Sequence, residues 1–163
     1  MIIVDGHCDS IGEHVDNKRL LNVHSSQGHV DLPRLRKGGV TVQFFASFIE
    51  AEYKGNQAAI RGLQLVEGCR KLIVDNPEYL LLLSGYKTIE EAHLTGRTAA
   101  LLSVEGGDAL GGNLFMLRVL YHLGVRALGL TWNHANDLAG GVAEPGGLTG
   151  FGREVVQEMN ALG

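Results

Sequence analysis

The chain has 163 residues, of which 45% are hydrophobic and 20% are charged, a composition typical of a soluble globular protein with one sizeable core. Its formal net charge is -4 at pH 7 and no basic stripe runs along it, which argues against a nucleic-acid partner. The longest apolar runs are far shorter than the roughly 20 residues that span a bilayer, so no membrane segment is expected.

The first residues and the cysteines bear on location. Met1 leads directly into an apolar segment without a charged or hydrophobic leader or a lipidation signal, so we expect a cytoplasmic protein. Two cysteines, Cys8 and Cys69, fit a reducing compartment, and we expect no disulfide between them. The 23 glycines are concentrated after residue 100, and such glycines often mark tight loops where backbone approaches a ligand.

The opening stretch, residues 2–9, runs from three β-branched residues into a polar cluster. This pattern predicts a short buried strand that ends in a loop carrying chemistry. His7 and Asp9 are two residues apart, so on an extended backbone their side chains point to the same side. An imidazole and a carboxylate that converge in this way form half of a site for a divalent metal, zinc most readily. A surface turn without a metal is the alternative interpretation.

A polar, irregular segment, residues 10–31, follows this loop and is placed to form a lip over the site. We interpret its three histidines, His14, His24 and His29, as solvated or loop residues rather than metal ligands.

The rest of the chain alternates between helical and strand patterns. Residues 40–49 are almost continuously apolar, which predicts a strand buried on both faces, as in a parallel sheet. Ile60, Leu63 and Val66 have the spacing of one apolar face in the longest predicted helix. In chain order the predicted elements are a short helix at 31–38 capped by Asp31, strand 40–49, helix 56–75, strand 79–83, a helix opened by a capping box at 88–91 and ended by Gly96, strand 98–104, helix 113–123, strand 125–130 and a helix from residue 149.

Polar residues gather where the predicted strands end. Glu105 follows strand 98–104, and residues 133–137 follow strand 125–130, just as His7 and Asp9 follow the first strand. The alternation of strands and helices predicts an α/β fold with a parallel sheet, in which the carboxyl ends of the strands meet at the face that carries active sites.

Several blocks, in their order and spacing, are similar to those of one enzyme family. The Asp-Gly-His-Cys-Asp block at residues 5–9 resembles the Asp-Gly-His-x-Asp opening of the membrane dipeptidase family, the renal-dipeptidase-like zinc metallopeptidases. Further blocks that resemble the family lie at residues 31–44, 103–107, 129–133 and 147–154. The resemblance covers essentially the whole chain.

The resemblance implies a parallel TIM-like (β/α) barrel with two zinc ions at its carboxyl face. It implies that His7 and Asp9 hold one zinc and that Glu105 bridges both ions, which then activate a water that hydrolyses the peptide bond of a dipeptide. Members of the family often carry a substrate-contacting histidine where this chain has Trp132. His134 or Asn136 takes over substrate contact in our interpretation, although Asn136 equally suits a role as a loop brace.

The length departs from the family pattern, because a full barrel needs about 250 residues whereas this chain supplies about four βα units. We therefore expect residues 1–163 to be the amino-terminal half of a single metallo-dependent hydrolase barrel domain, apparently truncated. The resemblance places two more histidine ligands, an arginine for the substrate carboxylate and a catalytic aspartate beyond Gly163. We expect the 163 residues alone to be weakly active or inactive.

Two other functions stay open at this point. Another metal-dependent barrel hydrolase of the amidohydrolase type is one, although such enzymes usually open with His-x-His. A non-catalytic half-barrel that binds a metal or a partner is the other. For the complete enzyme we expect a homodimer.

Overall fold

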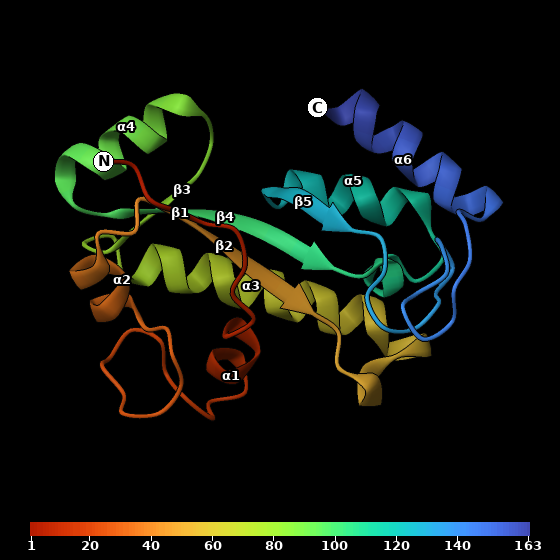
Figure 1. Ribbon diagram of the computed structural model, residues 1–163, viewed down its shortest axis with the longest axis horizontal. Coiled ribbons are helices and arrows are strands. Elements are labelled where there is room, and N and C mark those ends of the chain that lie inside the picture. Colours follow the sequence, from red (N-terminus) through yellow and green to blue (C-terminus); the bar gives the residue numbers. More distant parts are fainter. The chain divides into compact units, whose positions relative to one another are not determined.

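The computed structural model describes all 163 residues, and these form two compact units. The first unit comprises Met1–Ser47 and Leu65–Leu102, and the second comprises Phe48–Gln64 and Ser103–Gly163. Figure 1 shows the helices and strands along the chain. The α-helices are α1 (Ile11–Val15), α2 (Leu32–Gly38), α3 (Ala58–Asp75), α4 (Tyr86–Thr95), α5 (Leu114–His122) and α6 (Gly150–Leu162). Three 3-10 helices are η1 (Ala51–Tyr53), η2 (Gly55–Gln57) and η3 (Gly107–Leu110).

The strands pair in the order β1-β2-β4-β3, and β5 pairs with β4. They are β1 (Val4–Asp5), β2 (Val42–Phe48), β3 (Leu80–Leu82), β4 (Thr98–Glu105) and β5 (Val125–Gly129). The β1–β2 pair is parallel with Val4 opposite Val42, and the β3–β4 pair is parallel with Leu80 opposite Thr98. The predicted α/β fold with parallel strands joined by helices is therefore confirmed.

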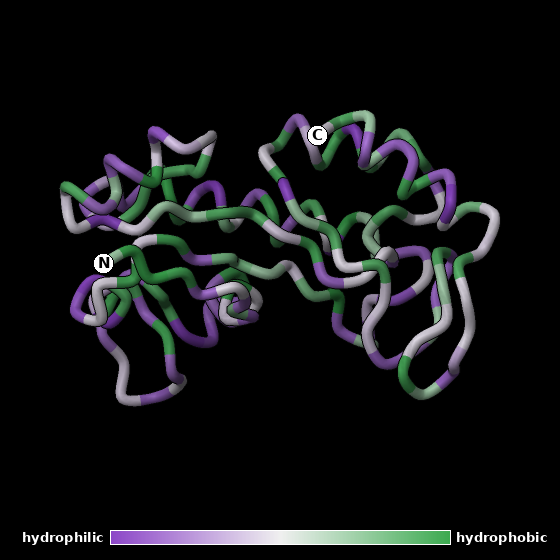
Figure 2. Tube along the Cα trace, turned by 45° about the horizontal axis from the view of Figure 1, so that its top comes forward, coloured by the Kyte–Doolittle hydropathy of each residue, from purple (hydrophilic) through white to green (hydrophobic).

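Burial along the central strands follows from their sequence. Every residue of β2 and β4 is buried or half-buried, as their continuous apolarity predicts for strands covered on both faces. Phe45 and Leu102, each 1% exposed, are among the largest buried side chains of these strands. In Figure 2 the long extended segments at the centre are mostly white to green, whereas the loops mix purple, white and green.

Three local predictions were wrong. The first strand, which was predicted to be buried, is exposed, because Ile2 and Val4 are 48% and 57% exposed and β1 spans only Val4–Asp5. The helix α4 begins at Tyr86 after Gly85 rather than at a capping box, and Thr88 instead pairs its hydroxyl with that of Ser84 at 2.9 Å. On α3, Ile60 is 60% exposed whereas the neighbouring Arg61 is buried. Val66 is fully buried as predicted, so the predicted and observed faces differ at the amino-terminal part of the helix.

Arg61 is buried because its charge has partners. Its guanidinium donates to both carboxylate oxygens of Glu50, at 2.6 and 3.0 Å, and lies 4.6 Å from the ring centroid of Tyr53. A charge that is paired and hydrogen-bonded tolerates burial, which an apolar periodicity cannot anticipate.

Both cysteines are free thiols, as expected, and both side chains are buried. Burial raises the pKa of the Cys69 thiol far above its ordinary value, so this residue serves as a small apolar core residue. None of the helices combines the length and the apolarity needed to cross a membrane.

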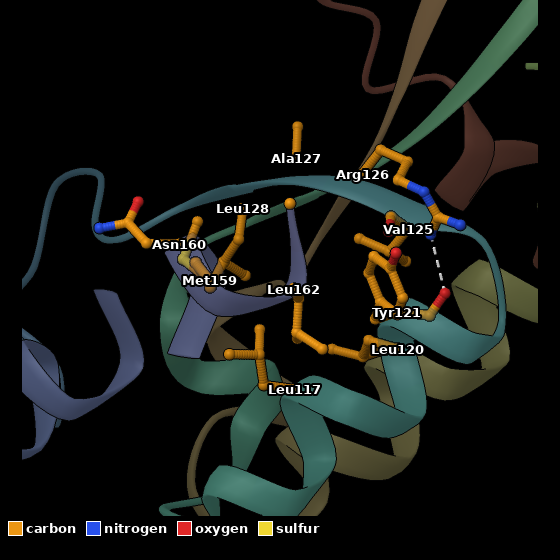
Figure 3. A pocket seen from close by; sticks show the side chains of 11 residues that line it. Leu117, Leu120, Tyr121, Val125, Arg126, Ala127, Leu128, Met159, Asn160 and Leu162 are labelled. Carbon is orange, nitrogen blue, oxygen red and sulfur yellow. Dashed lines mark hydrogen bonds between the residues drawn. The ribbon is translucent and has the colours of Figure 1, made fainter. Parts of the chain in front are cut away.

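An apolar groove of about 180 Å³ lies among α5, β5 and α6 in the second unit, and Figure 3 shows its lining. Part of its wall is formed by Leu117, Met159 and Leu162. At one end, the Arg126 guanidinium donates a hydrogen bond to the Tyr121 carbonyl at 2.8 Å. No histidine, cysteine or carboxylate lines it. The groove therefore has no ligands for a metal.

Candidate metal and substrate site

The loop after β1 holds its shape through two backbone contacts. The Asp5 carboxylate accepts a hydrogen bond from the His7 N–H at 3.1 Å, a turn that aspartate forms readily. The Cys8 carbonyl accepts one from the Ala46 N–H of β2 at 2.9 Å, and the Cys8 side chain is only 6% exposed. Because side chains alternate along an extended backbone, an inward Cys8 turns His7 and Asp9 outward together.

His7 and Asp9 lie side by side. The His7 Nε2 atom is 2.9 Å from the Asp9 Oδ1 atom, and their side chains are 53% and 58% exposed. The sequence prediction that the two side chains share one side is confirmed. A nitrogen and an oxygen donor in contact with solvent are ligands that a zinc ion accepts and can reach.

An open groove of about 550 Å³ surrounds this pair in the first unit. Residues of the predicted lip line it, among them Arg19, Gly28 and His29. Arg19 is 9% exposed, pairs with the Glu13 carboxylate at 2.5 Å and donates to the Val30 carbonyl at 2.7 Å. A side chain at Gly28 would meet the Arg19 guanidinium at 2.5 Å, so the wall of the groove is tightly packed here.

The other two histidines of this segment have structural partners. His14 is neither in a loop nor solvated as predicted, because it lies in α1 and is half-buried. It accepts a hydrogen bond from the Leu21 N–H at 3.2 Å, and burial lowers its pKa. His24 lies 3.2 Å from the Asp31 carboxylate, which is fully buried and caps α2 by accepting from the Arg34 N–H at 2.8 Å. Neither histidine lines the groove with His7 and Asp9.

Glu105 is the last residue of β4 and belongs to the second unit. The backbone after it is fixed to β5, because the Gly106 N–H donates to the Gly129 carbonyl at 3.0 Å and the Gly107 N–H to the Leu130 carbonyl at 2.9 Å. Glu105 lines a cavity of about 260 Å³ within this unit. The convergence of Glu105 with His7 and Asp9 stays a prediction, because the three residues are divided between the units.

His134 lines the same cavity as Glu105 and its side chain is 61% exposed. Its Nδ1 atom lies 3.4 Å from a Glu144 carboxylate oxygen. The other oxygen of Glu144 accepts from the Ala135 N–H at 2.9 Å, and this bond, followed by the contact with His134, lowers the pKa of Glu144. The loop that carries His134 is thus held in place while its imidazole is open to a ligand.

Asn136 braces the loop. Its amide nitrogen donates to the Leu130 carbonyl at 2.8 Å and to Asp108 at 3.3 Å, and its amide oxygen accepts from the N–H groups of Leu138 and Ala139 at 2.9 and 3.3 Å. These bonds match the bracing role that the sequence left open beside substrate contact.

A comparison with protein families decides the identity. The family model described as membrane dipeptidase (peptidase family M19) matches residues 1–163. The chain belongs to the membrane dipeptidase family. The resemblance read from the sequence blocks is thereby confirmed.

Curated members of the family are similar over nearly the whole chain. Dipeptidase 3 of Rattus norvegicus is 33% identical over 174 aligned residues, which cover 99% of this chain and 35% of that protein. Dipeptidase aclJ of Aspergillus oryzae is 30% identical and is covered to 43%. The chain therefore spans about two fifths of the length of these relatives.

The fold agrees with a solved member of the metallopeptidases. The crystal structure of a metallo peptidase from Rhodobacter sphaeroides, liganded with a phosphinate mimic of the dipeptide L-Ala-D-Ala, superposes with a TM-score of 0.89 at 23% identity. The match covers 99% of this chain and 56% of that one. The expectation that the chain has the α/β fold of about half of a larger structure of this kind is confirmed.

For this dipeptidase-family chain, sequence reasoning missed part of the cavity beside Glu105. Glu50, Lys54 and Asp108 also line it, with the Lys54 ammonium 3.5 Å from an Asp108 oxygen. Glu50 comes two residues after the end of β2. The rule that located Glu105, a polar residue where a buried strand ends, would have located Glu50 as well.

Proposed function

We propose that the protein is a zinc-dependent dipeptidase, which hydrolyses the peptide bond of dipeptides. In this proposal both units are parts of one complete barrel domain. The observation that carries the proposal is the His7–Asp9 pair, with its ring nitrogen and carboxylate oxygen 2.9 Å apart, in a chain of a metallopeptidase family. A homodimer and a cytoplasmic location stay predictions from the sequence.

In this proposal three residues of the chain would hold the metal. His7 and Asp9 would serve as ligands of one zinc ion, and Glu105 would be a ligand shared with a second ion. Zinc bound there would supply Lewis-acid polarisation of the substrate carbonyl and a water of lowered pKa, about 7, as the nucleophile at neutral pH.

The remaining tasks of the chain are to orient and enclose the substrate. His134 contacts the dipeptide, since its exposed imidazole shares a cavity with Glu105. Asn136 holds the loop that presents it. An amidohydrolase-type reaction is less well supported, because the second ligand of the opening motif is Asp9 rather than a histidine.

Metal content and activity together test the proposal. Purified full-length protein is assayed with a panel of dipeptides, and its zinc is counted by mass spectrometry. We expect Glu105→Gln and Asp9→Asn to contain less zinc than the wild type and to have a kcat/KM at least about 100-fold lower, because the loss of a ligand weakens the affinity for zinc. The control is Glu154→Gln, which removes an exposed carboxylate of α6 in the unit that holds Glu105. Unchanged zinc content and activity in Glu105→Gln would refute the proposal.

A further inference from the structure

The cavity beside Glu105 has an aromatic wall. Phe48 is the last residue of β2, and Trp132 lies in the loop after β5. Both side chains line the cavity. Their rings meet edge to face, with centroids 5.2 Å apart and planes at 87°. Trp132 is nevertheless 52% exposed, so the contact with Phe48 fixes the indole without covering it.

Apart from the proposed metal ligand Glu105, the carboxylates and the ammonium group that line this cavity have partners of opposite charge. Lys54 lies 3.5 Å from Asp108, and Glu50 takes a bidentate pair of hydrogen bonds from Arg61. Beside Glu105 and His134, the aromatic surface is therefore the feature of this cavity that an apolar group of a ligand can recognise. A rigid, half-exposed aromatic pair at a cavity is suited to packing against an apolar group, because burial of that surface is the main gain on binding.

The position of the aromatic wall indicates that the apolar group is a side chain of the substrate. Trp132, Phe48 and Glu105 line one cavity, all within the second unit. A substrate held at a metal on Glu105 therefore has a side chain within reach of the wall. The cavity, about 260 Å³, has room for one large side chain.

We propose that Phe48 and Trp132 form a side-chain subsite, which makes the protein prefer dipeptides with an aromatic or large apolar residue on one side of the scissile bond. The proposal rests on the proposed dipeptidase function and adds a substrate class to it. Trp132 is then a specificity-determining residue.

Selectivity is measured with two dipeptide series, Ala-X and X-Ala, in which X is Gly, Ala, Leu or Phe. In one of the series we expect kcat/KM for X = Phe to exceed that for X = Ala by at least about tenfold, the scale on which an apolar pocket discriminates. Trp132→Ala should reduce this ratio to about threefold or less, whereas Trp132→Phe should keep most of it.

Phe115→Ala is the matched control, because Phe115 is an aromatic residue of α5 with 56% exposure that does not line the cavity. Its selectivity ratio should equal that of the wild type. Equal rates for X = Ala and X = Phe in both series, or an unchanged ratio in Trp132→Ala, would overturn the proposal.

A binding measurement separates this inference from the proposed activity. Trp132 is the only tryptophan among the 163 residues, and the difference between wild type and Trp132→Phe isolates its fluorescence in the full-length protein. Phosphinate mimics of dipeptides carrying a methyl or a benzyl side chain are titrated into the zinc-loaded protein. We expect the benzyl mimic to change the Trp132 emission and to bind at least about tenfold more tightly.

The hydrolysis assay and the fluorescence titration distinguish failure of the proposed function from failure of the proposed subsite. Binding of the benzyl mimic with a Trp132 signal, but no hydrolysis of any dipeptide, would contradict the proposed function and leave the subsite standing. Hydrolysis without side-chain preference and without a Trp132 signal would contradict the subsite and leave the proposed function standing.

Discussion

The amino terminus of α6 is packed so closely onto the loop of residues 131–148 that one methyl group should disturb both. The Thr149 N–H donates to the Leu138 carbonyl at 2.9 Å, and the Thr149 hydroxyl accepts from the Gly152 N–H at 2.9 Å. A Cβ atom at Gly152 would lie 2.0 Å from the Leu138 carbonyl oxygen. The change Gly152→Ala therefore places a methyl group where the loop backbone already is.

The magnitude follows from the geometry. To reach the 3.0 Å that real Cβ contacts respect, the Leu138 carbonyl must retreat by about 1 Å, and this weakens its bond from Thr149. Leu138 has little freedom to move, since its side chain is fully buried. Overpacking of this kind costs about 1–3 kcal/mol and the hydrogen bond about 1 kcal/mol, while alanine gains about 1 kcal/mol in helix propensity. We expect a net loss of about 1–3 kcal/mol in the free energy of unfolding.

Urea unfolding of the full-length protein measures this loss. The control is Gly150→Ala in the same helix turn, because a Cβ atom there meets nothing within 4 Å. That variant should be neutral or more stable by up to about 1 kcal/mol. Trp132 lies in the displaced loop, so its fluorescence should also change in Gly152→Ala. Equal unfolding free energies for the two variants would refute the reasoning.

Three further predictions concern the first unit and the metal. Asp31→Asn should cost about 2–4 kcal/mol in urea unfolding, because an amide NH2 in place of one carboxylate oxygen cannot accept the bonds from the Arg34 guanidinium and the Ser25 N–H. Burial alone would raise the pKa of Asp31, but hydrogen bonds from Ser25 and Arg34 lower it below its ordinary value. The difference in the free energy of unfolding between wild type and Asp31→Asn should therefore be full above about pH 4 and be lost as pH falls through the lowered pKa. Cys8 and Cys69 are buried, and burial raises the pKa of both thiols. A thiol reagent at neutral pH should therefore label them only after unfolding. Rapid labelling of the native protein would contradict their burial. Chelation of metal should abolish dipeptide hydrolysis and zinc should restore it, and activity that persists in metal-free protein would contradict the proposed function.

The sequence by itself determined the features that depend on near neighbours along the chain. The apolar runs of β2 and β4 predict strands covered on both faces, because burial on each side demands an apolar residue at every position. The outward pairing of His7 and Asp9 follows from the two-residue period of an extended backbone. The order of the motif blocks also sufficed for the family, which the match over residues 1–163 confirms.

Only the tertiary structure decided features that depend on partners far along the chain. The buried face of α3 includes Arg61 because Glu50 meets its charge, and a periodicity of apolar residues contains no information on such a partner. The aromatic wall joins Phe48 to Trp132, residues separated by most of the second unit's sequence. Which strand ends share one cavity is fixed by strand pairing, a long-range interaction that a local pattern permits but does not specify.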